Sequence, residues 1–387
     1  MYKHPKRSAW VRSFAAIVLI VTGSFFLANC SAPDAAQKES PVLSDNSPQS
    51  TEAVYPVYDQ SEAAQPDTIT IKGTEYSTAL TELDLSGIGL VDADIADLKY
   101  MTELTKLILG SGSAGLSQSY QLKISDISPI KGHVNLEYLD LSGNQILTID
   151  PLEELTSLKY LNISNNQISD IRALENLSSL QYMSLDDNDI SEISGLSTLV
   201  NLEYLSMVNN RIQDISPLGN HIALTYLDLT SNRIEDIGIL KNLKSLTTLC
   251  LSNNNVNDLD ALVELSDLKN LTLANNRISD IDALGSIASL ESLILGHNII
   301  SDIGPLAGLT NMEILDLGNN EISDVSPVTD MASLRVLSLN DNEIDDISLI
   351  KELTNLESLN LQNNSRLDAE HISELQAFIP DCWISWT

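Results

Sequence analysis

The sequence predicts an α/β solenoid, in which short parallel strands form a curved sheet on the concave face and short turns or 3-10 segments cover the convex face. Three observations predict this class. From residue 136 the chain repeats every 22 residues, an asparagine recurs eight residues into each unit, and each unit alternates apolar and polar residues over a short stretch. One such unit cannot bury a core alone, so the units must stack.

Residues 1–29 are expected to be an export signal, because a basic start precedes an apolar run from Phe14 to Leu27 that is too short for a membrane span. The following Leu27-Ala28-Asn29-Cys30 resembles the lipobox of bacterial lipoproteins, in which the leader is cleaved before a cysteine that then carries lipid. This resemblance implies lipidation of Cys30 and anchoring in the cell membrane. The lipobox usually has Gly, Ala or Ser where this chain has Asn29, so a plain secretory leader, which would release the protein, or an uncleaved short anchor stays open.

Residues 30–67 are expected to form a flexible linker behind the lipid anchor. They are rich in Ser, Pro, Ala, Gln and acidic residues, and such a composition cannot bury enough surface to offset its ordering entropy. Across the whole chain, 54 acidic residues outnumber 21 basic ones, for a net charge of −33. This charge repels nucleic acid and anionic lipid surfaces and favours basic partners or divalent cations.

Residues 68–135 are expected to hold two irregular repeats. Both keep the strand leucines, but Ile88 stands where the first should have its asparagine. The second, opening at Leu104, lies 32 residues before Leu136 instead of 22, so ten residues are inserted within Gly110–Leu122. This Gly/Ser-rich insertion is either a binding loop or a neutral surface insertion, since insertions in such arrays map to one face.

Residues 136–366 are expected to be regular repeats with the pattern LxxLxLxxNxI, the signature of leucine-rich repeats. Leu161 and Ile163 alternate around Asn162 as in a strand with one face inward. The asparagine is expected to lie buried at the bend and satisfy backbone groups that neither sheet nor helix covers. The recurrent asparagines are Asn144, Asn166, Asn188, Asn210, Asn232, Asn254, Asn276, Asn298, Asn320, Asn342 and Asn364.

An aspartate recurs before the outer turn of most units, and two roles compete for it. One is calcium binding; the other, which we favour, is capping, because a carboxylate there can accept from free backbone amides and the spacing of an EF-hand loop is absent. No metal site or cofactor is therefore expected. The row is Asp170, Asp214, Asp236, Asp258, Asp280, Asp302, Asp324 and Asp346.

Residues 367–387 are expected to close the array. A helical pattern starts near Asp368, places Ile372, Leu375 and Phe378 on one face and ends before Pro380, and residues 382–384 have the pattern of a last strand. Such an element covers the exposed end of the core, as repeat arrays require. Cys382 is expected to be a small buried residue in this cap, too far from Cys250 for a disulfide.

Five tyrosines occupy the first outward position of consecutive predicted strands: Tyr138, Tyr160, Tyr182, Tyr204 and Tyr226, here called the tyrosine row. The next outward position is polar and includes Asp140 and Asp228. Cross-strand stacking that stabilises the sheet by a few tenths to about 1 kcal/mol per pair is one explanation of the row. A concave ligand-binding surface is the other, and we favour it because tyrosine is enriched at interface anchors.

Three further residues are weighed as reactive groups and predicted to be structural. His221 and His133 replace core leucines and are expected to be hydrogen-bonded or partly exposed. Neither has a Cys, Ser or acid at a spacing that assembles a catalytic group. Cys250 is expected to project from the concave face, where it could act as a reactive thiol, but no basic residue beside it indicates activation. The sequence therefore predicts a protein without enzymatic activity.

The 22-residue unit, the Asn-x-Ile-x-Asp-Ile core and the recurrent Ile-x-Pro-Leu, as at residues 149–152, 215–218 and 303–306, resemble the internalin-like leucine-rich repeats of bacterial surface proteins. The resemblance covers about residues 78–387. It implies a monomeric cell-surface protein that binds a partner, most often a protein, on its concave face. The alternative is a structural lipoprotein that binds cell wall or glycan.

Overall fold

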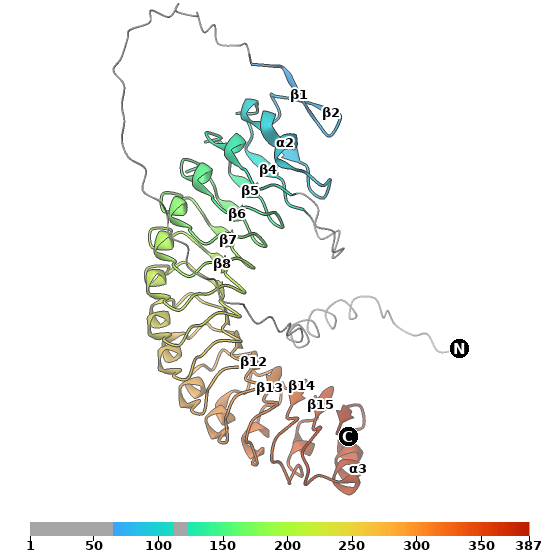
Figure 1. Ribbon diagram of the computed structural model, residues 1–387. Helices are drawn as coiled ribbons and strands as arrows, with labels where there is room; N and C mark the ends of the chain where they lie inside the picture. The colour runs from blue at the N-terminus through green and yellow to red at the C-terminus, as the bar shows by residue number, and fades with distance from the viewer. Residues whose placement is uncertain (1–64, 112–122, 387) are drawn as a thin grey trace, which may run out of the picture. The chain divides into compact units, whose positions relative to one another are not determined.

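Most strands of the chain form one long parallel sheet, in which each strand pairs with the strand of the next unit. The computed structural model describes residues 65–111 and 123–386, all within the unit Ala63–Thr387. Its 14-stranded sheet runs in sequence order from β3 to β16, which confirms the predicted solenoid class (Figure 1). Its strands are β3 Glu82–Asp84, β4 Lys106–Ile108, β5 Tyr138–Asp140, β6 Tyr160–Asn162, β7 Tyr182–Ser184, β8 Tyr204–Ser206, β9 Tyr226–Asp228, β10 Thr248–Cys250, β11 Asn270–Thr272, β12 Ser292–Ile294, β13 Ile314–Asp316, β14 Val336–Ser338, β15 Ser358–Asn360 and β16 Trp383–Ser385.

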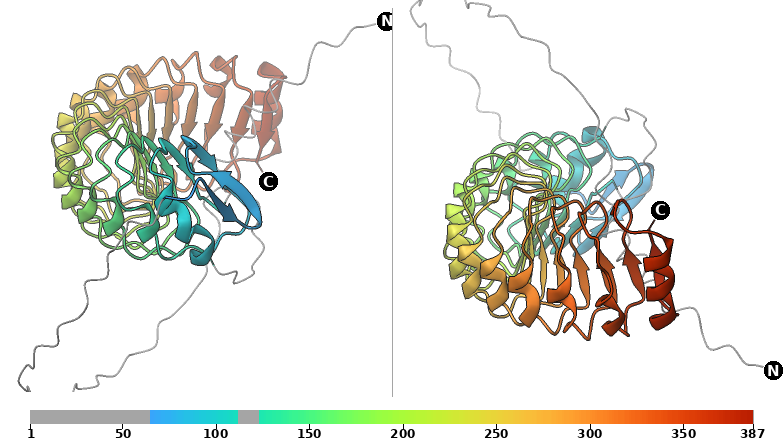
Figure 2. Two further views of the ribbon diagram at one scale, coloured as in Figure 1. Left: turned by 90° about the horizontal axis from the view of Figure 1, so that it is seen from above. Right: turned by 90° about the horizontal axis from the view of Figure 1, so that it is seen from below.

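Short helical segments return the chain from each strand to the next along the outer side of this unit, while the strands line its inner side (Figure 2). They are 3-10 turns because the return has room for about one turn between two buried anchor residues. Apart from the α-helix α2 Asp92–Ile95, they are η1 Ala96–Tyr100, η2 Ser128–Ile130, η3 Asp150–Leu152, η4 Arg172–Leu174, η5 Ser194–Leu196, η6 Ser216–Leu218, η7 Gly238–Asn242, η8 Asp260–Glu264, η9 Asp282–Ser286, η10 Gly304–Gly308, η11 Ser326–Val328 and η12 Ile350–Glu352.

The recurrent asparagine bonds to backbone groups at the bend, as predicted, and some of these groups belong to the neighbouring unit. Asn188 Nδ2 lies 3.0 Å from the carbonyl oxygens of Ile163 and Leu185, and its Oδ1 accepts from the amide of Ile168 at 3.0 Å. The same arrangement recurs along the array, for example at Asn254. Each asparagine therefore serves backbone groups of its own unit and of the one before it, which an apolar residue could not do.

The residue before each of these asparagines has left-handed backbone, a conformation that favours Gly, Asn and Asp. In the first regular unit it is Gly143, with φ of 72°. In the others it is mostly Asn or Asp, such as Asn165 with φ of 54°, and Ser231 and His297 are the exceptions. The tight bend after each strand therefore explains the polar residue at this position.

The N-terminal end of the unit carries a hairpin that the sequence analysis did not predict. Strands β1 Thr68–Ile71 and β2 Thr74–Ser77 pair antiparallel through Lys72 and Gly73. Both linking residues have positive φ, of 51° and 80°, as a two-residue hairpin turn of the right twist requires. Ile69 and Ile71 are buried, so the hairpin extends the core beyond the first repeat.

The predicted C-terminal helix and last strand are both present, as α3 Ala369–Phe378 and β16. Asp368 caps the helix, because its carboxylate accepts from the amides of Glu370 and His371 at 2.9 and 3.2 Å. The expectation that Phe378 faces the core is wrong: its side chain is 61% exposed, and Ile379, one residue further, is buried instead. At 100° per residue, Ile379 falls between Ile372 and Leu375 on the helix face, whereas Phe378 lies on the far side of Leu375, at the edge of that face.

Candidate functional site

The tyrosine row lies on the sheet as the sequence predicts, one ring at the start of each strand from β5 to β9. The register pairs each tyrosine directly with the next, from Tyr138 with Tyr160 to Tyr204 with Tyr226. Each ring is half-buried, whereas the residue after it, Leu or Met, is fully buried. The rings therefore point away from the core and into the hollow of the sheet.

Neighbouring rings of the tyrosine row are stacked face to face. Their centroids lie 4.0, 4.3, 4.2 and 4.3 Å apart along the row, with interplanar angles of 5° to 10°. At the N-terminal end, the Nζ atom of Lys106 lies 5.2 Å from the centroid of Tyr138. At the other end, the strand register sets Thr248 beside Tyr226. The faces between neighbouring rings are thus covered along the row, and the exposed part of each half-buried ring is an edge.

The hydroxyls of Tyr160, Tyr204 and Tyr226 remain protonated at physiological pH. Burial raises the pKa of Tyr160, Tyr204 and Tyr226 above the usual value for tyrosine, and hydroxyl contacts along the row contribute to each shift. A neutral phenol both donates and accepts a hydrogen bond. The tyrosine row therefore combines hydroxyl groups that can form hydrogen bonds with the apolar surface of the stacked rings.

Asp140 and Asp228 lie at opposite ends of the row, on β5 and β9. Asp140 accepts from the amide of Ser142 at 2.8 Å, and Asp228 accepts from the amide of Thr230 at 2.9 Å. The hydroxyl of Tyr226 lies 3.4 Å from the other carboxylate oxygen of Asp228. Burial raises the pKa of Asp228, because a charged carboxylate loses solvation there.

A third carboxylate of the concave face, Asp186, was not singled out by the sequence analysis. It follows β7 by two residues, and its Oδ1 accepts from the Ser206 hydroxyl at 2.5 Å and the Val208 amide at 2.8 Å. The proximity of Asp186 also raises the pKa of Asp228. Period-two alternation continued past the strand would have identified it as outward-facing.

Cys250 lies beside Asp228 on the neighbouring strand, and its environment suppresses thiolate formation. Burial, together with the adjacent carboxylate of Asp228, raises the pKa of the thiol to about 12. Because the thiolate is the nucleophilic form, this cysteine is not activated. Cys382 is buried in the C-terminal element as predicted, and both cysteines are free.

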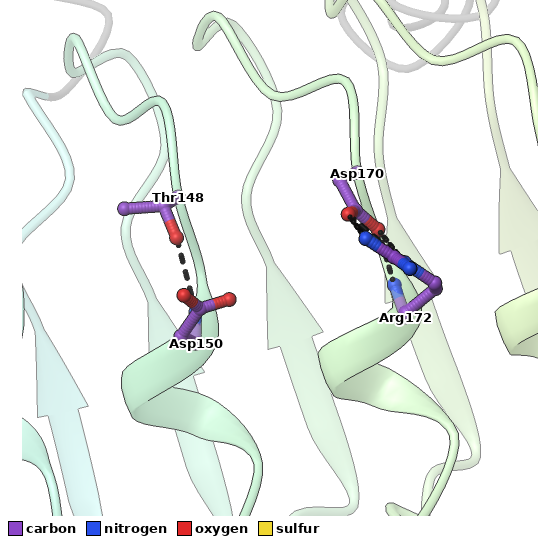
Figure 3. A network of polar contacts seen from close by, with 4 residues as sticks. All are labelled: Thr148, Asp150, Asp170 and Arg172. Atoms are coloured by element: carbon purple, nitrogen blue, oxygen red, sulfur yellow. Dashed lines mark hydrogen bonds and ion pairs between the residues drawn. The ribbon is translucent and has the colours of Figure 1, made fainter.

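The aspartates before the outer turns accept hydrogen bonds from backbone amides, the capping role predicted for them. Each carboxylate accepts from the amide two residues later, as Asp214 does from Ser216 at 2.8 Å. Asp170 also holds the side chain of Arg172, which lowers the pKa of Asp170 to about 2 (Figure 3). In the preceding unit Thr148 takes this place, and its hydroxyl lies 3.5 Å from the Asp150 amide.

In residues 65–111 and 123–386, no three His, Cys, Asp or Glu side chains are grouped as metal ligands.

The two core histidines are fully buried. The ring nitrogens of His133 lie 2.9 Å from the carbonyl oxygen of Ile130 and 3.1 Å from that of Leu98. His221 has one such contact, 3.1 Å to the Leu218 carbonyl. Its Nε2 makes no hydrogen bond, although the nearby Leu196 carbonyl partly offsets the effect of burial on the pKa of the ring. Their expected hydrogen bonds are therefore present, but neither ring reaches the concave surface.

Two predicted features fall outside the described residues. These are Cys30, with the leader and linker around it, and most of the insertion within Gly110–Leu122. In the part of the chain that is described, no helix has the length and apolar character needed to cross a membrane.

Comparison with known families and structures identifies the repeat. The family model "Leucine Rich repeats (2 copies)" matches residues 134–176, 178–220, 222–264, 244–286, 288–330 and 332–374. An internalin from Listeria monocytogenes, inlF, is similar in structure with a TM-score of 0.73 at 30% sequence identity, over 81% of this chain and 89% of that one. No curated protein sequence matches the chain.

Two more distant structures share the fold. The functional domain of InlJ from Listeria monocytogenes, which includes a cysteine ladder, has a TM-score of 0.51 at 22% identity, over 75% of this chain and 70% of that one. The plant peptide hormone receptor RGFR1, in complex with RGF2, has a TM-score of 0.63 at 18% identity, over 80% of this chain and 53% of that one.

Proposed function

This chain belongs to the leucine-rich-repeat family in its internalin form, and from that premise we propose that it is a bacterial cell-surface protein that binds another protein on its concave face. The tyrosine row, with Asp140 and Asp228 at its ends, is the proposed contact surface. Leucine-rich-repeat arrays are binding scaffolds, so a binding role without catalysis fits the family. A structural neighbour in complex with its ligand shows that this fold accommodates one.

The observation that carries the proposal is that the array does not need the tyrosines for its fold. Strands β10 to β12 begin with Thr248, Asn270 and Ser292 and keep the same parallel register. Stacking therefore adds stability but is not a requirement of the sheet. Five half-exposed aromatic rings confined to one half of a concave surface are the composition expected of an interface anchor.

The covered ring faces favour a protein over a glycan as the ligand. Sugars bind aromatic side chains by laying their apolar face on an open ring face, and neighbouring rings here are 4.0 to 4.3 Å apart. A protein surface can instead use ring edges and hydroxyls through side-chain packing and hydrogen bonds. The glycan-binding alternative has no comparable geometric support.

We propose further that the protein is anchored through lipid on Cys30 and acts as a monomer. Metabolic labelling with radioactive palmitate tests the anchor: the wild-type protein should carry label, and the Cys30→Ala variant should not. A wild-type protein that takes up no label would overturn the anchor and leave the binding proposal intact.

Pull-down experiments test the binding role. The whole repeat array is used to capture ligands from extracted surface proteins and, in parallel, from purified cell-wall polysaccharide. Replacing Tyr160, Tyr182 and Tyr204 with Ser should abolish capture of the protein ligand, while circular dichroism reports an intact fold. The matched control replaces Thr248, Asn270 and Ser292 with Ala on the same face and should retain capture. Equal capture by both variants, or capture of polysaccharide alone, would contradict the proposal.

A further inference from the structure

The half of the concave face that carries the tyrosine row has almost no positive charge. The side chains that face its hollow are the first and third residues of strands β4 to β9 and the residue two positions beyond each strand. Among these, the charged ones are Lys106 and the carboxylates Asp140, Asp186 and Asp228. Lys106 lies over the ring of Tyr138, at the edge of this half.

The three carboxylates lack cationic partners within the described residues. Their hydrogen bonds come from backbone amides, hydroxyls and an amide side chain, as when Ser184 and Ser206 donate to Asp186. None of the ion pairs among the described residues includes them. A carboxylate offers about four acceptor positions, so each can still receive a charged donor.

Partial burial makes this unpaired charge costly. Asp228 is partly removed from solvent beside Tyr226 and Cys250; this burial raises its pKa, and so does the negative charge of Asp186. A partner that brings a cation to this position relieves that cost, and the attraction is stronger than at an open surface because solvent screens it less. The unpaired charge therefore favours a basic ligand over a neutral one.

We propose that the protein ligand presents arginine or lysine side chains to Asp140 at one end of the tyrosine row and to Asp186 and Asp228 at the other. This inference rests on the proposed function and specifies the partner of the same surface. Asp140 and Asp228 are separated by four strand spacings, about 19 Å, so two separate basic side chains are required. Their aliphatic stems lie across the tyrosine edges, since the stacked ring faces leave no room for a cation.

Panning a phage-displayed random peptide library on the immobilised protein, in EDTA, tests this partner chemistry. Clones that bind wild type but not the Tyr160, Tyr182 and Tyr204 to Ser variant should be enriched in Arg and Lys. The enrichment should disappear on a variant in which Asp140, Asp186 and Asp228 are all changed to Asn. It should persist when Glu154, Glu175 and Glu192, which are exposed residues outside the sheet, are changed to Gln.

One selected peptide then gives the quantitative test by calorimetry. Replacing its arginines with citrulline, which has a similar shape but no charge, should weaken binding at least about tenfold, as should Asp228→Asn. Tyrosine-dependent clones without basic enrichment would overturn this inference and leave the proposed function standing. If no clone distinguishes wild type from the tyrosine variant, the proposed function fails, and this inference with it.

Discussion

His221 and His133 occupy the same position in two different units, three residues before the opening leucine, yet they differ in hydrogen bonding. Both ring nitrogens of His133 face carbonyl oxygens, whereas Nε2 of His221 is buried without a partner. Burial also lowers the pKa of His221 below its usual 6.5. A histidine that stays neutral in the folded protein but is protonated in the unfolded chain costs stability at acidic pH.

His221→Leu, the residue most other units have here, should therefore stabilise the protein. Removing the unpaired nitrogen should raise the free energy of unfolding by about 1–2 kcal/mol at neutral pH. The contribution of His221 to the free energy of unfolding is constant above pH 6.5 and falls as the pH drops below that value. The stabilisation by His221→Leu should therefore be larger at acidic pH. Urea unfolding across this range measures both effects.

His133→Leu provides the opposite case, because it removes the imidazole's hydrogen bonds to two buried carbonyl oxygens, those of Ile130 and Leu98, which keep only their backbone donors. This variant should lower the free energy of unfolding. If both substitutions stabilised the protein, the hydrogen bonds of these histidines would not determine how each one affects the free energy of unfolding.

A second prediction concerns the single residue with left-handed backbone that follows each strand. Asn165 has φ of 54°, where a β-branched residue is strained. Asn165→Val should lower the free energy of unfolding by about 1–2 kcal/mol, and Asn165→Gly by less than about 0.5 kcal/mol. Chemical denaturation of the two variants side by side measures the difference, and equal losses would show that backbone conformation is not the cause.

Among the elements, the asparagine bend is predicted to be the least replaceable. In Asn188→Leu, the buried amide of Ile168 would lose its acceptor. The carbonyls of Ile163 and Leu185 would each lose one donor and keep another, from Asn166 and Asn210. The free energy of unfolding should fall by about 2–3 kcal/mol, since three hydrogen bonds are lost and the orphaned amide keeps its desolvation cost. Thermal melts of this variant compare directly with Asn176→Ala, an exposed asparagine that should change stability by less than about 0.5 kcal/mol.

The elements that the sequence predicted are those in which one physical requirement recurs in every unit. The strand and the asparagine serve the same backbone groups in all eleven regular units, and the capping aspartate does so in eight of them, so their spacing is visible in the chain. The hairpin of β1 and β2 and the exposed side chain of Phe378 occur once, at the ends of the array. The ends of the array have no equivalent in another unit, so the 22-residue repeat does not indicate their structure.

The candidate site follows the same division. Alternation within a three-residue strand predicts that the tyrosine row faces outward, and the fixed repeat length predicts that its rings meet. Cross-strand stacking, one of the two explanations of the row, is present in the structure. The spacing does not predict the face-to-face geometry of the rings or the burial of Asp228, because both depend on how the sheet curves. Asp186 was missed because it lies beyond the strand, where alternation was no longer applied.

At the scale of the whole molecule, two electrostatic effects of opposite sign compete. Ion pairs such as Lys159 with Glu137 are exposed, and each contributes at most about 1 kcal/mol. Against them stands the net charge of −33, whose self-repulsion opposes a compact fold. Both weaken with salt, so the direction of the salt effect shows which is larger.

We expect the repulsion to be larger, because acidic residues outnumber basic ones 54 to 21 and most of them have no basic side chain to pair with. The melting temperature should therefore rise as NaCl is increased from about 0.01 M to about 1 M, which shortens the Debye length from about 30 Å to about 3 Å. KCl should act equally if screening is the cause. A melting temperature that falls with salt would mean that the array depends on its surface ion pairs, and repulsion between its acidic units would then be too weak to shape its stability.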